Sequence, residues 1–267
     1  MKIGFGEGTF SKKFLPQENP TKRRNTLDWL TKLVEEFKVA FIVDNRWKYI
    51  VDGIGSTLLL TFLSLILGVV IGVIIAAVRS TYDKQYTDMR AGIGKTLLKI
   101  GNGICKCYLT IFRGTPVMVQ ILIIFFVIMA SSRNKMLCGV VAFGLNSAAY
   151  VAEIIRSGIM SIDPGQTEAG RSLGLNYIQT MAYIVLPQAF KNILPALANE
   201  FITLLKETSV AGYVGVTDLT RGANIIRGIT YQSFWPLFAI AAIYLAMVMF
   251  FTWLVGKLER RLKNSER

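Results

Sequence analysis

Residues 161–188, SIDPGQTEAGRSLGLNYIQTMAYIVLPQ, form the longest polar connection between the apolar stretches of this chain. Asp163 is a favourable N-cap residue, and Pro164 suits the first position of a helix because it needs no backbone N–H there. These residues predict a short helix from Pro164 to about Leu173. Gly174 follows at the position where many helices end in a left-handed turn.

The second half of this stretch repeats the pattern of a helix start. Asn176 can act as an N-cap, and Gln179 lies three residues after it, as in a capping box. The spacing predicts a second short helix that runs to Pro187. Two short helices joined at a glycine, between two apolar spans, are typical of an element that docks a partner in water.

Composition places the chain among membrane proteins. Hydrophobic residues make up 52% of its 267 residues, and the mean hydropathy is +0.46. Because a helix needs ~20 apolar residues to cross a bilayer, we expect an all-α membrane protein with about five transmembrane helices. The net charge of +13 fits lysines and arginines that set topology and contact anionic lipid, so we expect no nucleic-acid partner. The expected spans cover residues 54–78, 104–130, 136–160, 188–213 and 234–255.

The regions outside these spans have distinct patterns. Residues 1–26 are basic and rich in glycine and proline, which predicts disorder. Residues 27–50 have helical apolar spacing and predict an amphipathic interfacial helix, with a partly ordered linker as the alternative. Residues 51–262 would form the transmembrane domain and 263–267 a tail. Basic residues in 79–99 and in the C-terminal tail predict that both face the cytoplasm, with 163–187 on the same side and the N-terminus outside.

The polar connection also resembles a family motif. Its residues Glu168-Ala169-Gly170, then Gly174, then Ile184-x-Leu186-Pro187 resemble the EAA motif of bacterial ABC-importer permeases, with glycine in place of the second alanine. Three further stretches resemble the polar amino-acid uptake branch, which includes histidine, glutamine and arginine permeases. They are FRGTPVMVQ at 112–120, LNSAAYVAEIIRSGI at 145–159 and NEFITLLKETSV at 199–210.

This resemblance implies a fold, a mechanism and partners. The fold would be that of type I ABC importer permeases (MetI-like), in a multi-pass protein of the bacterial plasma membrane. Two permease subunits, identical or homologous, would pair above two cytoplasmic ABC ATPases, and an external amino-acid-binding protein would deliver the solute. Loop 163–187 would be the coupling helix that contacts the ATPase. The ATPase-coupling residues would be Glu168, Ala169, Gly170, Gly174, Ile184, Leu186 and Pro187.

Nothing in the sequence predicts catalysis. It contains no GxxxxGK[ST] phosphate loop, so we expect ATP and Mg²⁺ to bind a partner subunit. It has no histidine and no metal-ligand pattern, so we expect no cofactor, metal or catalytic residue in this chain. An ion-coupled secondary amino-acid transporter is the alternative function, but it would leave the EAA spacing unexplained.

Polar residues inside the spans are candidates for the solute path because they are costly in lipid. Glu153 and Arg156 lie three apart and have a second interpretation as a pair that neutralises itself. Lys206 and Glu207 have the same alternative. The substrate-path candidates are Asn146, Ser147, Tyr150, Glu153, Glu200 and Thr203.

Overall fold

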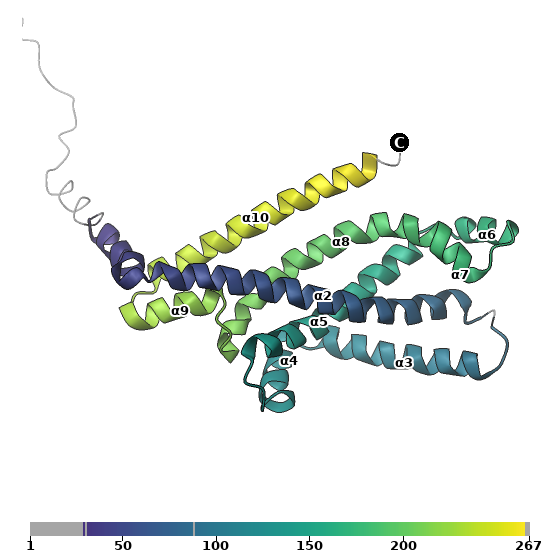
Figure 1. Ribbon diagram of the computed structural model, residues 1–267, viewed down its shortest axis with the longest axis horizontal. Helices are drawn as coiled ribbons and strands as arrows, with labels where there is room; N and C mark the ends of the chain where they lie inside the picture. The colour runs from purple at the N-terminus through teal and green to yellow at the C-terminus, as the bar shows by residue number, and fades with distance from the viewer. Residues whose placement is uncertain (1–28, 30, 88, 265–267) are drawn as a thin grey trace, which may run out of the picture.

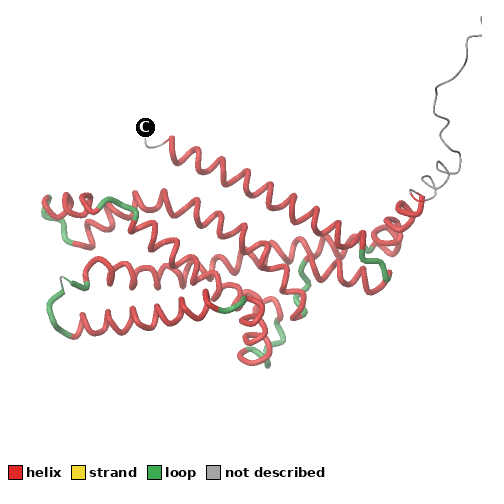
Figure 2. The backbone as a smooth tube through the Cα atoms, turned by 180° about the vertical axis from the view of Figure 1, so that it is seen from behind, coloured by secondary structure: helices red, strands yellow, loops and turns green. Residues whose placement is uncertain are grey.

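Helix α2 (Trp47–Gln85) is the longest element of the computed structural model, which describes residues 29, 31–87 and 89–264 (Figure 1). It extends the predicted span at 54–78 by about two turns toward each end. The predicted disorder of residues 1–26 lies outside the described residues. Helices form nearly all of the described chain, and these residues include no β-strand (Figure 2).

A bent helix pair follows α2. Its two parts meet at an angle of 109°. The sequence predicts a kink at Gly114 and Pro116, whereas the backbone turns away almost at a right angle there. Thr115 and Pro116 both have an extended backbone conformation. For Thr115 the reason is that a proline ring disfavours a helical conformation in the residue before it. The elements are α3 (Ile93–Gly114), α4 (Val117–Ile123) and the π-helical turn η3 (Ile124–Ile128).

In the second half of the chain, helices α5 and α8 lie at the centre of the molecule and helix α10 lies at its periphery. Helix α5 lies against α2, and α10 starts next to α9 and runs beside α8 (Figure 1). The elements are α5 (Lys135–Met160), α6 (Pro164–Ser172), α7 (Tyr177–Thr180), η4 (Met181–Val185), α8 (Leu186–Glu207), η5 (Thr208–Val214), α9 (Leu219–Thr230) and α10 (Phe234–Asn264).

Helices α2, α5 and α10 are long and apolar enough to cross a membrane, and the bent pair counts as a fourth span. Helix α8 also has 22 residues and packs beside α5 and α10, but its polar side chains make it less apolar than α2, α5 and α10. With α8 included, the described residues contain the five spans that the sequence predicts.

Small residues bring α2 and α5 into close contact. A Cβ atom added at Gly72 would lie 2.7 Å from Cγ1 of Val151, and one added at Gly68 would lie 3.1 Å from Cβ of Ser147. Gly68 and Gly72, four residues apart on α2, therefore admit α5 at close range. This contact places the middle of α2 level with the middle of α5.

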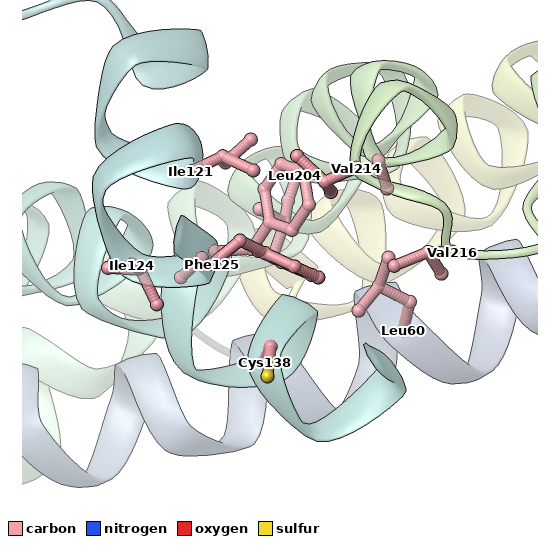
Figure 3. Packing of buried hydrophobic residues seen from close by; sticks show 11 residues of the cluster. Leu60, Ile121, Ile124, Phe125, Cys138, Leu204, Val214 and Val216 are labelled. Carbon is pink, nitrogen blue, oxygen red and sulfur yellow. The ribbon is translucent and has the colours of Figure 1, made fainter. Parts of the chain in front are cut away.

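One apolar cluster joins four parts of the chain. Side chains from α2, α4–η3, α5 and the end of α8 converge beside η5 (Figure 3). The cluster therefore ties the bent pair to the central helices and fixes the direction in which α4 leaves α3. Its buried members include Leu60, Ile121, Ile124, Phe125, Cys138, Leu204, Val214 and Val216.

Residues before α2 pack at the opposite end of the molecule from α6 and α7 (Figure 1). Residues 31–37 are helical, followed by η1 (Lys38–Ile42) and η2 (Val43–Asn45). Phe41 is buried against α9 and α10, and the ring of Phe37 meets Trp235 edge-on at 5.3 Å. The predicted single helix over 27–50 is therefore interrupted, and it is anchored to protein. Its end of the molecule lies opposite α6 and α7.

Candidate functional site

The element α6–α7 has the caps that the sequence predicts. The Asp163 carboxylate accepts a hydrogen bond from the Gly165 N–H at 2.7 Å, and Pro164 begins α6. Gly174 has φ 81°, a left-handed conformation that side chains with a Cβ rarely adopt. Asn176 and Gln179 form a reciprocal capping box at 2.9 and 3.0 Å.

The prediction that the second helix stops at Pro187 is wrong. Helix α7 continues through η4 into α8 without interruption. The π-helical turn η4 uses wider hydrogen-bonded rings, which lets the helix pass a residue that lacks a backbone N–H. The Gln188 side-chain amide also donates to the Ile184 carbonyl at 2.9 Å. The predicted motif therefore ends inside a helix that runs directly into the membrane region.

Gly170 is the departure from the EAA pattern, and the structure gives it a packing role. It is the one buried residue of α6. A Cβ atom added there would lie 2.7 Å from Cγ2 of Thr180 and 3.0 Å from Cδ1 of Ile184. The fully buried Thr180 therefore occupies the space that an alanine at position 170 would need.

We expect Gly170→Ala to lower the stability of the protein by about 1 kcal/mol. The helix propensity of alanine would contribute up to ~1 kcal/mol, but overpacking against Thr180 costs about 1–3 kcal/mol. Thermal unfolding in detergent would measure the loss. Adding Thr180→Ala should recover most of it, since that change empties the occupied space. A double variant no more stable than Gly170→Ala would contradict this explanation.

The predicted coupling residues occupy two environments. Glu168, Ala169, Leu186 and Pro187 are exposed, whereas Ile184 is half-buried beside Gly170. Large apolar side chains surround the exposed group: Leu173 is 79% exposed, Ile178 76% and Tyr183 73%. Exposed apolar groups clustered at a helical tip are typical of a protein–protein contact.

A cavity of about 660 Å³ lies between α6–α7 and the inner end of α2. Its lining includes Lys84, Glu168, Arg171 and Tyr177. Burial raises the pKa of the Tyr177 hydroxyl, so this side chain stays neutral at physiological pH. The cavity therefore separates part of α6 from the inner end of α2.

A buried amide network holds the bend between α3 and α4. Pro116 cannot donate to the Phe112 carbonyl, and the Gln120 side-chain amide donates to it instead at 2.8 Å. The same nitrogen lies 3.0 Å from the Thr115 carbonyl. Asn146 of α5 donates to the Gln120 side-chain oxygen at 2.8 Å. Asn146 therefore supports the bend from the neighbouring helix.

Charged residues join three helices near the inner end of α5. Arg156 binds Glu153 at 2.5 Å and Asp83 of α2 at 3.1 Å. Arg113 of α3 lies 4.0 Å from Glu153 and 5.7 Å from the centre of the Tyr150 ring. The suggestion that Glu153 and Arg156 pair is confirmed, and a cavity of about 430 Å³ adjoins Glu153 and Arg113.

The structure divides the predicted substrate-path residues into two groups. Asn146, Ser147 and Glu200 are buried between helices, where the Ser147 hydroxyl donates to Glu200 at 2.8 Å. Tyr150 and Glu153 are half-buried, and Thr203 is exposed on α8. Sequence reasoning missed Gln120 and Asp83. The signal for Gln120 was a single polar residue in the apolar run after Pro116.

The sequence and fold have clear relatives. The family described as binding-protein-dependent transport system inner membrane component matches residues 92–264. The chain belongs to this family. It is a transport subunit with the type I ABC importer permease fold, as the comparisons below also show.

Two curated relatives of the permease illustrate its place in the family. The arginine transport system permease protein ArtQ of Bacillus subtilis is 42% identical over 166 residues, which are 61% of this chain and 76% of that protein. The glutamine transport system permease protein GlnP of Escherichia coli is 36% identical over 169 residues, or 61% and 77% of the two chains.

Solved structures agree with the fold. A crystal structure of an amino acid ABC transporter with histidines is 41% identical, covers 83% of the permease and 98% of its own chain, and has a TM-score of 0.72. The inward-facing MetNI methionine ABC transporter has a TM-score of 0.67 over 80% of the permease and 95% of its own chain. At 21% identity, the second likeness shows the fold alone.

Proposed function

We propose that this permease pairs with a second permease subunit to form the passage for amino acids through a bacterial plasma membrane. An external binding protein would deliver the amino acid, and cytoplasmic ATPases would drive the transfer. The observation that carries the proposal is the capped α6–α7 element, which has the EAA spacing and exposes an apolar tip at the end opposite α9. The names of the relatives support amino acids as the substrate class.

The shape of α6–α7 suits transmission of movement from an ATPase. Gly170 packs against Thr180, so α6 and α7 would move together when a partner displaces them. Helix α7 continues into α8, which passes the displacement directly into the membrane region. Arg156 links α5 to α2 close to the same end. Closure of two ATPases would therefore tilt α8 and α5 between inward and outward access.

We propose that the six predicted substrate-path residues have two kinds of role. Tyr150, Glu153 and Thr203 would contact the amino acid, because their side chains remain accessible. Asn146, Ser147 and Glu200 would position the helices around it, because their hydrogen bonds join α4, α5 and α8. A free amino acid carries an ammonium and a carboxylate, and groups of both signs occur near these residues.

Uptake by reconstituted vesicles tests the function. The permease, its ATPase and its binding protein would be assembled with ATP inside the vesicles and a panel of labelled amino acids outside. We expect uptake that requires ATP, the ATPase and the binding protein. Uptake driven by an ion gradient, with neither ATPase nor ATP, would instead establish the secondary-transporter alternative and overturn the proposal.

A further inference from the structure

A groove of about 660 Å³ runs along the C-terminal half of α10. Its wall is apolar toward the middle of the helix and cationic toward the C-terminus. Gly256 lies between these two parts and leaves open space, because no neighbouring side chain lies within 4 Å of the position of an added Cβ. The groove therefore has the polarity of an amphiphile, with an apolar part and a charged part in line. Its lining includes Val248, Met249, Trp253, Gly256, Lys257 and Arg260.

The groove opens away from the rest of the protein. On the opposite side of α10, the rings of Phe201 and Phe251 meet at 4.9 Å, which places that side against α8. Arg260 follows Phe251 by nine residues, so it lies ~180° around the helix at ~100° per residue. Met249 is 63% exposed and Trp253 is 61% exposed. The groove is therefore open to whatever surrounds α10 in the membrane.

The cationic part of the groove lies at a membrane surface. Helix α10 has no charged residue from Phe234 to Gly256, a stretch of about 34 Å at ~1.5 Å per residue. This length matches a hydrocarbon core of about 30 Å crossed at a small tilt. Lys257 and Arg260 therefore lie at the level of the lipid headgroups. Helix α10 runs from α9 toward the end of the molecule where α6 lies, which is the cytoplasmic end in the proposed topology (Figure 1).

The two cations of the groove are available to an anion. The ion pairs among the described residues do not include Lys257 or Arg260. The Lys257 ammonium lies 5.5 Å from the centre of the Trp253 ring, so the indole holds it beside the groove. Glu259 is half-buried and lies ~100° around the helix from Arg260. The groove therefore presents two cations next to an apolar wall, and a phosphate group accepts charge-assisted hydrogen bonds from such cations.

We propose that this groove binds an anionic phospholipid of the inner leaflet. One acyl chain would lie along Val248 and Met249, and the phosphate would lie between Lys257 and Arg260. A zwitterionic lipid fits less well, because its own cationic group offsets the negative charge that the groove attracts. Only the choice of leaflet rests on the proposed function, since the site itself depends on the geometry of α10.

Photocrosslinking tests what occupies the groove. The photoreactive residue benzoylphenylalanine would replace Met249 in the full permease complex, reconstituted in vesicles of equal parts phosphatidylglycerol and phosphatidylcholine. One lipid at a time would carry a label in its acyl chain. Phe238, which is 61% exposed on α10 outside the groove, is the matched control position. We expect the ratio of phosphatidylglycerol to phosphatidylcholine adducts to be at least about fivefold higher at position 249 than at position 238, the gain from one cation beside anionic lipid.

Two outcomes of this experiment would overturn the proposal. Equal ratios at positions 249 and 238 would mean that the groove does not select anionic lipid. Adducts with a protein subunit in place of lipid would mean that the groove lies in a subunit interface.

Removing single charges tests the headgroup contact. Arg260→Gln and Lys257→Gln, each combined with the photoreactive residue at position 249, should lower the ratio about fivefold. Arg261→Gln is the matched control, because Arg261 is exposed one residue later on a side of α10 that does not line the groove. A loss from Arg261→Gln as large as that from Arg260→Gln, or no loss from either, would overturn the site. Because crosslinking requires no transport, failure of the proposed function would show separately, as absence of uptake by the unmodified complex.

Discussion

Replacing Glu168 with lysine is expected to abolish assembly with the ATPase while leaving the permease folded. Glu168 is exposed on α6, and the ion pairs of the described residues do not include it. A carboxylate in this position suits a basic group on the partner. A charge left unpaired in an interface costs about 2–5 kcal/mol, or roughly 30-fold or more in affinity. Like charges brought face to face add to this cost.

Co-purification of the ATPase with tagged permease would measure the loss, with membrane yield of the permease as the test of folding. Glu259→Lys makes the same change of charge near the C-terminal end of α10 and should leave assembly unchanged. Glu168→Gln, which keeps the shape and removes only the charge, should give an intermediate loss. Full ATPase binding and uptake by Glu168→Lys would remove Glu168 from the proposed interface.

Local chemistry made the α6–α7 element predictable from sequence. Asp163, Gly174 and the Asn176–Gln179 pair each satisfy backbone groups within a few residues of themselves, so their effect can be read without knowing the tertiary fold. The apolar runs of α2, α5 and α10 were equally predictable from the sequence, because each exceeds the length that a bilayer requires.

Features that depend on partners distant in sequence were not predictable in the same way. Gly170 departs from the EAA pattern in sequence, and its packing role depends on Thr180, ten residues later and on another helix. A pair between Arg156 and Glu153 was one of two interpretations of the sequence, and the second partner of Arg156, Asp83, is 73 residues away. Pro187 was expected to end a helix, but the π-helical turn before it removes the conflict. In each case a tertiary contact or a change of helix type overrode a local preference.

The bend between α3 and α4 is expected to be sensitive to replacement of one polar residue, Gln120. Four groups bond the Gln120 side chain: the carbonyls of Phe112 and Thr115 and the Thr115 hydroxyl accept from its amide, and Asn146 donates to its oxygen. Gln120 and Asn146 are buried, so water does not replace the bond between them, whereas Thr115 is exposed. Gln120→Met keeps the volume and removes all of these bonds. We expect the free energy of unfolding to fall by about 3 kcal/mol, the cost of leaving buried polar groups unsatisfied.

Chemical denaturation in detergent would measure this change, with Gln188→Met as the matched control. Gln188 is exposed, and its amide bonds to the Ile184 carbonyl and the Gln166 side chain are also exposed, so its loss should cost no more than about 0.5 kcal/mol. The double variant Gln120→Met/Asn146→Leu should cost less than the sum of the two single variants, because it no longer leaves a buried Asn146 amide with only its long bond to the Phe112 carbonyl at 3.4 Å. Strict additivity would mean that Gln120 and Asn146 act independently. The bend would then be held by the proline and by the apolar cluster around Ile121 and Phe125 alone.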